Sequence, residues 1–305
     1  MRPTRGHLST RTRDIHGDTS DVTDPDLEAV SETLFLPLYA LALESRAGHP
    51  VLIDRESVRL TEELNQTFAD SDRRLYRKLA RGRFPKTAVT TVALRIRHFD
   101  QVVAAFLERE PDGTVVSLGC GLSNRRSRVD NGTMRWLDID LPAAMELRRS
   151  YFEDTERFRS IAKSVLEFDW MDQLADAPGE RFLFVAEGLF PYLPEDGIRD
   201  LVTELQRRFP GAELVAEFAS RKVVRLMSGR LGRGKLRRRF GLSDDVWFQS
   251  GLSDPHEPEE WAEGITFLND WCYFDESEPR LNRMRPFTRL EVVGRPLFVA
   301  RYRLG

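Results

Sequence analysis

The sequence is poor in the residues that form covalent or metal cross-links. Among its 305 residues, Cys120 and Cys272 are the two cysteines, and they lie too far apart to form a CxxC pair. A disulfide framework and a paired-cysteine zinc site are therefore excluded, which is typical of a protein in a reducing compartment. The five histidines have no spacing typical of metal ligands, so no metal site is predicted.

Long hydrophobic runs and an excess of one charge are also absent. The longest apolar stretches, LFLPLYALAL and FLFVAEGLFPYL, are too short and too interrupted to span a bilayer. The first residues are rich in arginine but lack the apolar core of a signal peptide. A formal net charge of −3 is small for this length and gives no sign of nucleic acid or a membrane surface as a partner. With 41% hydrophobic and 31% charged residues, the composition predicts a globular cytoplasmic protein.

The hydrophobic pattern divides the chain into three parts. Residues 1–24 are polar, which predicts a disordered tail. Residues 25–112 have helical periodicity throughout, and a helix is expected over 86–109 because its apolar residues recur every three or four positions. Residues 113–305 alternate short apolar segments with helical patterns, which favours an α/β domain with a parallel sheet covered on both faces.

Five strand candidates alternate with helices in the α/β part: TVVSL, MRWLDI, RFRSIA, RFLFVAE and AELVAEF. The chain closes with RLEVVGRPLFVARYRL, which predicts an antiparallel hairpin around Gly294 added to the parallel sheet. Residues 219–288 separate the fifth strand from this hairpin, far more than an ordinary connection contains. We expect this insertion to form a lid that shapes the substrate site.

The first of these strands leads into the turn Gly119-Cys120-Gly121, at the edge where α/β sheets bind ligands. Glycine has no Cβ, so the backbone there can turn tightly and approach a ligand closely. A dinucleotide fingerprint would need a third glycine at position 124, which is Asn124, and no GKS or GKT follows for a P-loop. The turn therefore favours a nucleoside ligand without a phosphate chain, and S-adenosyl-L-methionine is the obvious candidate.

The second strand carries two acidic residues near its end. Asp138 and Asp140 are two positions apart, so they lie on one face of the strand. An acidic residue about twenty positions beyond the glycines is placed to accept both hydroxyls of a ribose. The alternative is that Asp140 caps the helix that begins at Leu141-Pro142.

Two further charged residues interrupt apolar patterns. Arg95 falls on the flank of the apolar stripe of its helix and needs an anionic partner, because an unpaired buried charge is costly. A ligand carboxylate would serve with bidentate geometry, and a protein carboxylate is the alternative. Glu187 ends an apolar strand at the ligand edge, where capping of the next helix is the competing role.

Three aromatic residues are candidates for the wall of a substrate pocket: Tyr192, Trp247 and Trp271. Packing in the core is the competing explanation for each of them, since aromatic side chains usually serve the core.

The stretch VVSLGCGLSNRRSRVDNGTMRWLDIDLPAAMELRRSYF resembles the leucine carboxyl methyltransferase family, in particular its bacterial branch that acts in polyketide synthesis. The likeness continues in TLFLPLYALALESR, ALRIRHFD, FVAEGLFPYL, FPGAELVAEF and WCYFD. The resemblance implies a Rossmann-like class I methyltransferase sheet, mostly parallel with a C-terminal antiparallel hairpin, under an N-terminal helical cover. It also implies S-adenosyl-L-methionine as the cofactor.

The resemblance implies roles at individual positions. Arg95 matches the arginine that binds the carboxylate of the cofactor's methionine part, and Glu187 matches a glutamate near its amino group. Gly119 and Gly121 lie on the cofactor loop, and Asp140 matches the acid that binds the ribose.

The adenine end of the site is matched less closely. Ser164 and Val165 fall where the family contacts the adenine, although a serine replaces the acid that the eukaryotic branch has there. The chain also has Ser123-Asn124 where the family often has aspartate and threonine, which leaves the local hydrogen bonding open.

The resemblance implies an O-methyltransferase, and we expect it to methylate a carboxylate, or a hydroxyl, of a small natural product such as a polyketide. A carboxylate is ionised at neutral pH and needs no catalytic base, which agrees with a chain that shows no Ser/His/Asp or Cys/His grouping. His98 points away from the apolar stripe of its helix and is a poor base, so no catalytic residue is assigned.

Three alternatives stay open at this point. The fold could bind the cofactor without transferring its methyl group. The basic run RLGRGKLRRRF could hold nucleic acid, although a solvated surface segment is the plainer explanation. A nicotinamide-dependent dehydrogenase is disfavoured by Asn124. The oligomeric state is not predicted.

Overall fold

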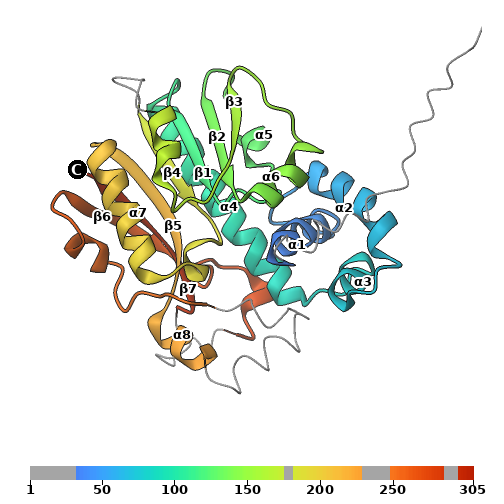
Figure 1. Ribbon diagram of the computed structural model, residues 1–305. Helices are drawn as coiled ribbons and strands as arrows, with labels where there is room; N and C mark the ends of the chain where they lie inside the picture. The colour runs from blue at the N-terminus through green and yellow to red at the C-terminus, as the bar shows by residue number, and fades with distance from the viewer. Residues whose placement is uncertain (1–31, 175–180, 229–247, 285–294) are drawn as a thin grey trace, which may run out of the picture.

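The computed structural model describes residues 32–174, 181–228, 248–284 and 295–305, drawn as coloured ribbon in Figure 1. The tail predicted at 1–24, Trp247, the basic run and the strand predicted before Gly294 lie outside these residues. Within the described part, helices flank one seven-stranded sheet. No described helix has both the length and the apolar character required to cross a membrane.

The strands follow the order β3-β2-β1-β4-β5-β7-β6. The first five are parallel to one another, and β7 is antiparallel to both of its neighbours. Their bounds are β1 Thr114–Leu118, β2 Arg135–Asp140, β3 Phe158–Ala162, β4 Phe182–Ala186, β5 Ala212–Ala219, β6 Ile265–Trp271 and β7 Leu297–Leu304. The predicted mostly parallel class I methyltransferase sheet is confirmed.

The predicted antiparallel end of the sheet is confirmed, with a second partner strand that the sequence did not indicate. Leu297–Leu304 forms the antiparallel strand β7, as expected, but the strand that pairs with its outer edge is β6. This strand comes from inside the insertion predicted at 219–288, so part of that insertion belongs to the sheet itself. Its pattern, ITFLNDW, was missed because its side chains are only partly buried and alternate weakly.

The helices have the periodicity that the sequence predicts, and α4 has the expected bounds. They are α1 Phe35–Ser45, α2 Arg55–Phe68, α3 Arg74–Ala80, α4 Lys86–Arg109, α5 Arg125–Val129, α6 Pro142–Arg149, α7 Glu195–Arg208 and α8 Arg221–Ser228. The short 3-10 helices are η2 Glu32–Leu34, η3 Phe168–Gln173, η4 Phe190–Tyr192, η5 Glu257–Glu260 and η6 Pro279–Leu281.

Apolar side chains on both faces of the sheet explain why its central strands read as continuous hydrophobic runs. Every residue of β1 and of β4 is buried. One face packs against α4 through Phe99, Val103 and Phe106, and the other packs against α7 through Leu201 and Leu205. The two helices therefore fix the sheet from opposite sides.

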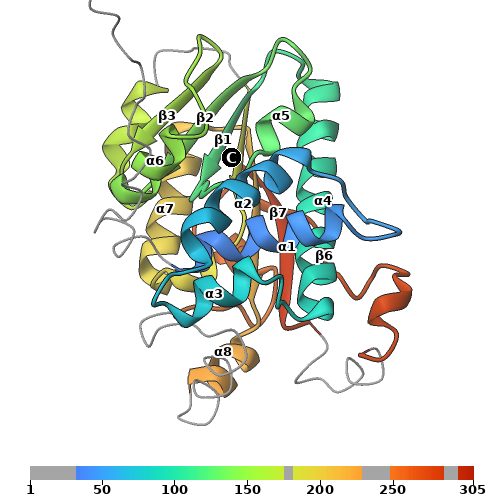
Figure 2. The same ribbon diagram turned by 90° about the vertical axis from the view of Figure 1, so that its right-hand side faces the viewer.

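The N-terminal helices lie beside α4, as Figures 1 and 2 both show, and their apolar side chains form a separate cluster. Its centre is aromatic: the ring of Phe68 stacks on Tyr76 at 4.2 Å and meets the edge of Phe35 at 5.0 Å between centroids. Leu122, directly after the glycine turn, is buried in the same cluster. The helical cover therefore packs on the loop that carries the predicted cofactor turn.

Phe184→Ala tests the two-sided burial of the sheet. Phe184 is fully buried in β4 and its ring contacts Phe182, Phe209 and Trp170. The substitution should lower the free energy of unfolding by about 3–5 kcal/mol, measured by urea denaturation, because it leaves a large cavity.

Ile53→Ala is the control for this measurement, because Ile53 is 60% exposed and should change the free energy of unfolding by less than about 0.5 kcal/mol. Equal effects for the two variants would contradict the proposed location of the core.

Candidate functional site

The glycine turn has the backbone geometry that its sequence predicts. Gly119 and Gly121 have φ values of +64° and +51°, in the left-handed region that favours glycine. The amides of Gly119 and Cys120 both donate to the carbonyl of Ile139, at 2.8 and 3.2 Å. A Cβ on Gly119 would lie 2.8 Å from a methyl of Leu189. The turn is therefore fixed against the end of β2, with no room for a side chain at its first position.

Asp140 binds the glycine turn directly. Its Oδ2 accepts a hydrogen bond from the amide of Gly121 at 2.7 Å, and its Oδ1 accepts one from the amide of Leu141 at 2.8 Å. The N-cap of α6 is Leu141 and makes no side-chain cap, so the helix-capping alternative does not describe Asp140. Burial raises the pKa of Asp140, and the two amides oppose this only in part. Each oxygen still has a lone pair for a hydroxyl donor.

Arg148 of α6 also binds the glycine turn, a role that was not predicted from the sequence. It is 2% exposed, and its Nη1 donates to the carbonyls of Gly121 at 3.0 Å and Ser123 at 2.7 Å. Its Nη2 donates to Asp138 at 2.6 Å, whose other oxygen accepts from the indole of Trp136. The available signal was spacing, because Arg148 follows the buried apolar positions of α6 by three and four residues.

Arg95 lies between two carboxylates, the buried Glu217 and the largely covered Glu187. Its Nε donates to Glu187 Oε1 at 2.9 Å, and its Nη1 donates to Glu217 Oε2 at 2.9 Å. The alternative of a protein carboxylate as partner is therefore realised, and one of the two partners is itself a predicted cofactor residue. Glu217, on β5, was missed. The signal for it was an acidic residue near the end of a largely apolar strand, and the structure leaves its side chain buried, at 3% exposure.

Glu187 has a second cationic partner. Arg125, which is 2% exposed, donates from Nη2 to Glu187 Oε2 and from Nε to Asp100 Oδ1. Burial alone would raise the pKa of Glu187, but the charges and hydrogen bonds of Arg125 and Arg95 outweigh it, and the pKa is lowered. Burial raises the pKa of Glu217, and Arg95 opposes this only in part. The two carboxylates that flank Arg95 are therefore shifted in opposite directions.

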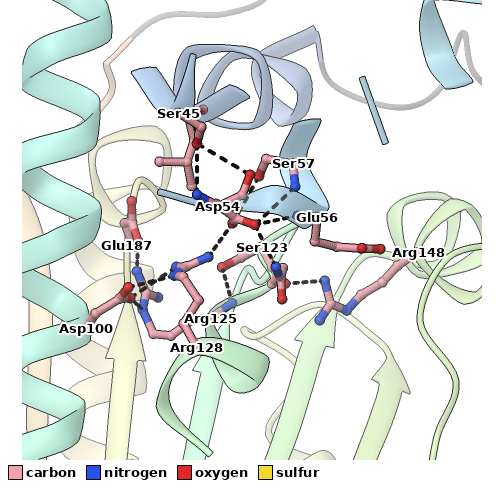
Figure 3. Close-up of polar contacts among 12 residues, drawn as sticks. Ser45, Asp54, Glu56, Ser57, Asp100, Ser123, Arg125, Arg128, Arg148 and Glu187 are labelled. Carbon is pink, nitrogen blue, oxygen red and sulfur yellow. Dashed lines mark hydrogen bonds and ion pairs between the residues drawn. The ribbon is translucent and has the colours of Figure 1, made fainter. Parts of the chain in front are cut away.

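Ser123 and Asn124, which replace the aspartate and threonine common in the family, both make local hydrogen bonds. Ser123 Oγ accepts from the amide of Arg125 at 3.3 Å, and Asn124 Nδ2 donates to Asp54 Oδ1 at 2.9 Å. Figure 3 shows Asp54 above this loop, within the N-terminal cover. Ser123-Asn124 therefore links the glycine turn to the start of α2.

The predicted adenine contacts lie at the next strand end. Ser164 and Val165 follow β3, which pairs with β2, and the amide of Lys163 donates to the carbonyl of Asp140 at 2.8 Å. The indole of Trp170 donates to the carbonyl of Val165 at 3.1 Å and fixes this segment. The structure therefore brings the predicted ribose and adenine residues to neighbouring strand ends.

The two described acceptor candidates have different surroundings. Tyr192, in η4, packs its ring edge against Phe248, and burial together with the charge of Glu217 raises its pKa to about 12. Trp271, at the end of β6, stacks on His98 of α4 with 4.3 Å between centroids. Burial lowers the pKa of His98 to about 4, so its imidazole is neutral at pH 7. The acceptor roles of both aromatic residues stay predictions.

The sheet, the glycine turn bonded to an acid, and the charged residues at the neighbouring strand ends define an S-adenosyl-L-methionine-dependent methyltransferase of class I. The profile of the family described as leucine carboxyl methyltransferase matches residues 37–206. The chain belongs to this family.

Two curated relatives agree with this assignment. The tetracenomycin polyketide synthesis O-methyltransferase TcmP of Streptomyces glaucescens is 30% identical over 262 residues, which cover 85% of this chain and 88% of the relative. The S-adenosyl-L-methionine-dependent methyltransferase dpfgK of Gibberella zeae is 28% identical over 202 residues, which cover 64% of this chain and 66% of the relative. The cofactor predicted from the sequence is thereby confirmed as S-adenosyl-L-methionine.

A solved structure shares the fold at low identity. A DUF574 family protein from Streptomyces avermitilis superposes with a TM-score of 0.53 at 12% identity, over 91% of this chain and 98% of that protein. At this identity the likeness concerns the fold alone.

Glu217→Gln should change how stability depends on pH. Burial raises the pKa of the Glu217 carboxyl above the ordinary 4.5. The titratable groups that interact with it are Arg95, Glu187, Tyr192 and Tyr273. Its contribution to stability is therefore present below pH 4.5 and is lost as the pH rises through the raised pKa. The thermal midpoint of the wild type minus that of the variant should be larger at about pH 4.5 than at about pH 7.5.

Glu204→Gln provides the control of opposite sign. Hydrogen bonds and charges from Arg207 and Arg208 lower the pKa of Glu204 to about 2, so its contribution is present above pH 4.5 and is lost as the pH falls. If the Glu217→Gln difference behaved like the Glu204→Gln difference, the raised pKa of Glu217 would be wrong.

Proposed function

We propose that this chain transfers the methyl group of S-adenosyl-L-methionine to an oxygen of a small natural product, with a carboxylate as the preferred acceptor and a hydroxyl as the other. The observation that carries the proposal is the pair of opposite charges, Arg95 and Glu187, beside the glycine turn. A free α-amino acid end has a carboxylate and an ammonium group, and this pair complements both.

The five neighbouring positions complete the proposed cofactor site. The turn at Gly119 and Gly121 lets the backbone approach the nucleoside, and Asp140 accepts hydrogen bonds from its ribose hydroxyls. Ser164 and Val165 contact the adenine from the next strand end. This order along the sheet edge, from methionine part to base, is supported by the register of β2 with β3 and of β1 with β4.

The chemistry of the acceptor decides what the protein must supply. The sulfonium of the donor is a good leaving group, and a carboxylate is already ionised at neutral pH. The protein then contributes alignment of the two reactants and exclusion of water, worth up to about 7–11 kcal/mol for well-oriented partners. A phenol acceptor would need a base, and His98, with its pKa lowered to about 4, is a weak one.

The name of one relative supports a polyketide-type acceptor. TcmP is named for tetracenomycin polyketide synthesis, and the alignment covers 88% of its length. We therefore propose an aromatic polyketide acid as the acceptor class, with Tyr192 and Trp271 as candidate contacts.

The proposed activity is tested by comparing two acceptors. The protein is incubated with S-adenosyl-L-methionine and either an aromatic polyketide carboxylic acid or its methyl ester, and S-adenosylhomocysteine is measured by mass spectrometry. The acid should give S-adenosylhomocysteine together with an ester that mild alkali hydrolyses, and the ester should give none. Turnover of the ester alone would point to a hydroxyl acceptor, and cofactor binding without turnover of any acceptor would favour a non-transferring protein.

Arg95→Ala should weaken S-adenosyl-L-methionine binding by about tenfold or more, measured by calorimetry, because it removes charge-assisted hydrogen bonds to the ligand carboxylate. Arg97→Ala is the matched control on the same helix, since Arg97 pairs with Glu276 and is 31% exposed. An unchanged dissociation constant in Arg95→Ala would remove Arg95 from the proposed site.

A further inference from the structure

Charged side chains of alternating sign connect the sheet to the N-terminal cover. Each is paired with the next through hydrogen-bonded ion pairs. In order from β5 to the start of α2 they are Glu217, Arg95, Glu187, Arg125, Asp100, Arg128 and Asp54. Figure 3 shows the part of this series that runs from Glu187 to Asp54. We call it the buried charge series.

Arg125 occupies the centre of the buried charge series. It begins α5, four residues beyond Gly121, and its guanidinium bridges Glu187 and Asp100 over the ring of Phe99. Arg125 is 2% exposed, and its partner Glu187 is the member of its two ion pairs that is a predicted cofactor residue.

We propose that Arg125 is a positioning residue for the methyl donor, which holds Glu187 oriented toward the ammonium group of the donor's amino acid end. The inference rests on the proposed function, because it assumes that Glu187 meets that ammonium and that Arg95 meets the neighbouring carboxylate.

The geometry gives Arg125 this role for one reason. Arg95 donates from Nε to Glu187 Oε1 and from Nη1 to Glu217 Oε2, so it is shared between two carboxylates. Without Arg125, Arg95 would be the one described cationic partner of Glu187. The ion pair between Arg95 and Glu187 would then compete with the ligand, because each side chain would be bound to the other instead of to the ligand. Arg125 holds Oε2 and leaves Arg95 able to bind a ligand carboxylate while Glu187 keeps a cationic partner.

The outer members of the buried charge series fix Arg125 in turn. Asp100 binds Arg125 at 2.8 Å and Arg128 at 2.7 Å, and Arg128 binds Asp54 at 2.6 Å. Asp54 is also the N-cap of α2, where it accepts from the amides of Glu56 and Ser57. The orientation of Glu187 is therefore fixed, through Arg125, by residues of both α4 and the helical cover.

The experiment compares two ligands that share a nucleoside. S-adenosylhomocysteine has the amino acid end, and 5′-methylthioadenosine lacks it. Dissociation constants of both are measured by calorimetry for the wild type, Arg125→Met and Arg125→Lys. Arg125→Met should weaken S-adenosylhomocysteine by about tenfold or more and 5′-methylthioadenosine by less than about twofold, since only the first ligand has the ammonium. Arg125→Lys keeps the positive charge but cannot bridge both carboxylates, so its dissociation constant for S-adenosylhomocysteine should lie between those of the wild type and Arg125→Met.

Arg126→Met is the matched control. Arg126 is the next residue of α5 and is also buried, but its ion pair is with Asp138 at 3.9 Å, outside the buried charge series, and it binds the carbonyl of Glu153 and lies over the rings of Phe152 and Phe158. Its loss should lower the thermal midpoint and leave the ratio of the two dissociation constants unchanged. Glu187→Gln should reduce the preference for S-adenosylhomocysteine over 5′-methylthioadenosine as much as Arg125→Met does. The double variant should show no further reduction, because the two residues act as one unit.

The outcomes separate the inference from the proposed function. Equal weakening of both ligands in Arg125→Met, or an unchanged constant for S-adenosylhomocysteine, overturns the positioning role. If Arg125→Met does not fold, the same ratio in Arg125→Lys decides. If the wild type binds neither ligand, the proposed cofactor site itself is wrong.

Discussion

The site depends on a general constraint: a charge that leaves water must be paired. Arg95, Arg125 and Arg128 are held between four carboxylates, so each guanidinium meets two anions, and the two inner anions, Glu187 and Asp100, each meet two cations. Replacing one member leaves its partners buried without compensation, which costs about 3–5 kcal/mol. The same requirement fixes each side chain in one orientation, which is what a site for a zwitterionic amino acid end requires.

The nucleoside side of the site is built from backbone groups instead. Gly119 and Gly121 take left-handed conformations, Asp140 accepts the amide of Gly121, and Arg148 donates to the carbonyl of the same residue. The peptide groups on both sides of Gly121 are therefore fixed by buried side chains from β2 and α6. A loop held in this way loses little conformational entropy when a ligand binds, because it is already ordered.

The sequence predicts the parts of this arrangement that depend on local periodicity. The helix at 86–109, the first five strands and the glycine turn follow from spacing and from glycine geometry. Glu217 and Arg125 could not be assigned, because their partners lie 122 and 62 positions away in the sequence and no local pattern reports such contacts. Strand β6 was not predicted for a related reason. It is a strand because it pairs with β7, and its own sequence shows little alternation of apolar and polar residues.

The count of charges bears on the direction of the proposed reaction. With every group ionised, the buried charge series holds four carboxylates against three guanidiniums, a net charge of −1, whereas the neutral form of Glu217, which burial favours, leaves the series balanced. The donor carries a sulfonium, an ammonium and a carboxylate, a net charge of +1, whereas the product S-adenosylhomocysteine has lost the sulfonium charge. In its fully ionised form the series would attract the cationic donor more strongly than the neutral product at the proposed cofactor site, because Coulomb interactions are screened less in a poorly solvated site than in water.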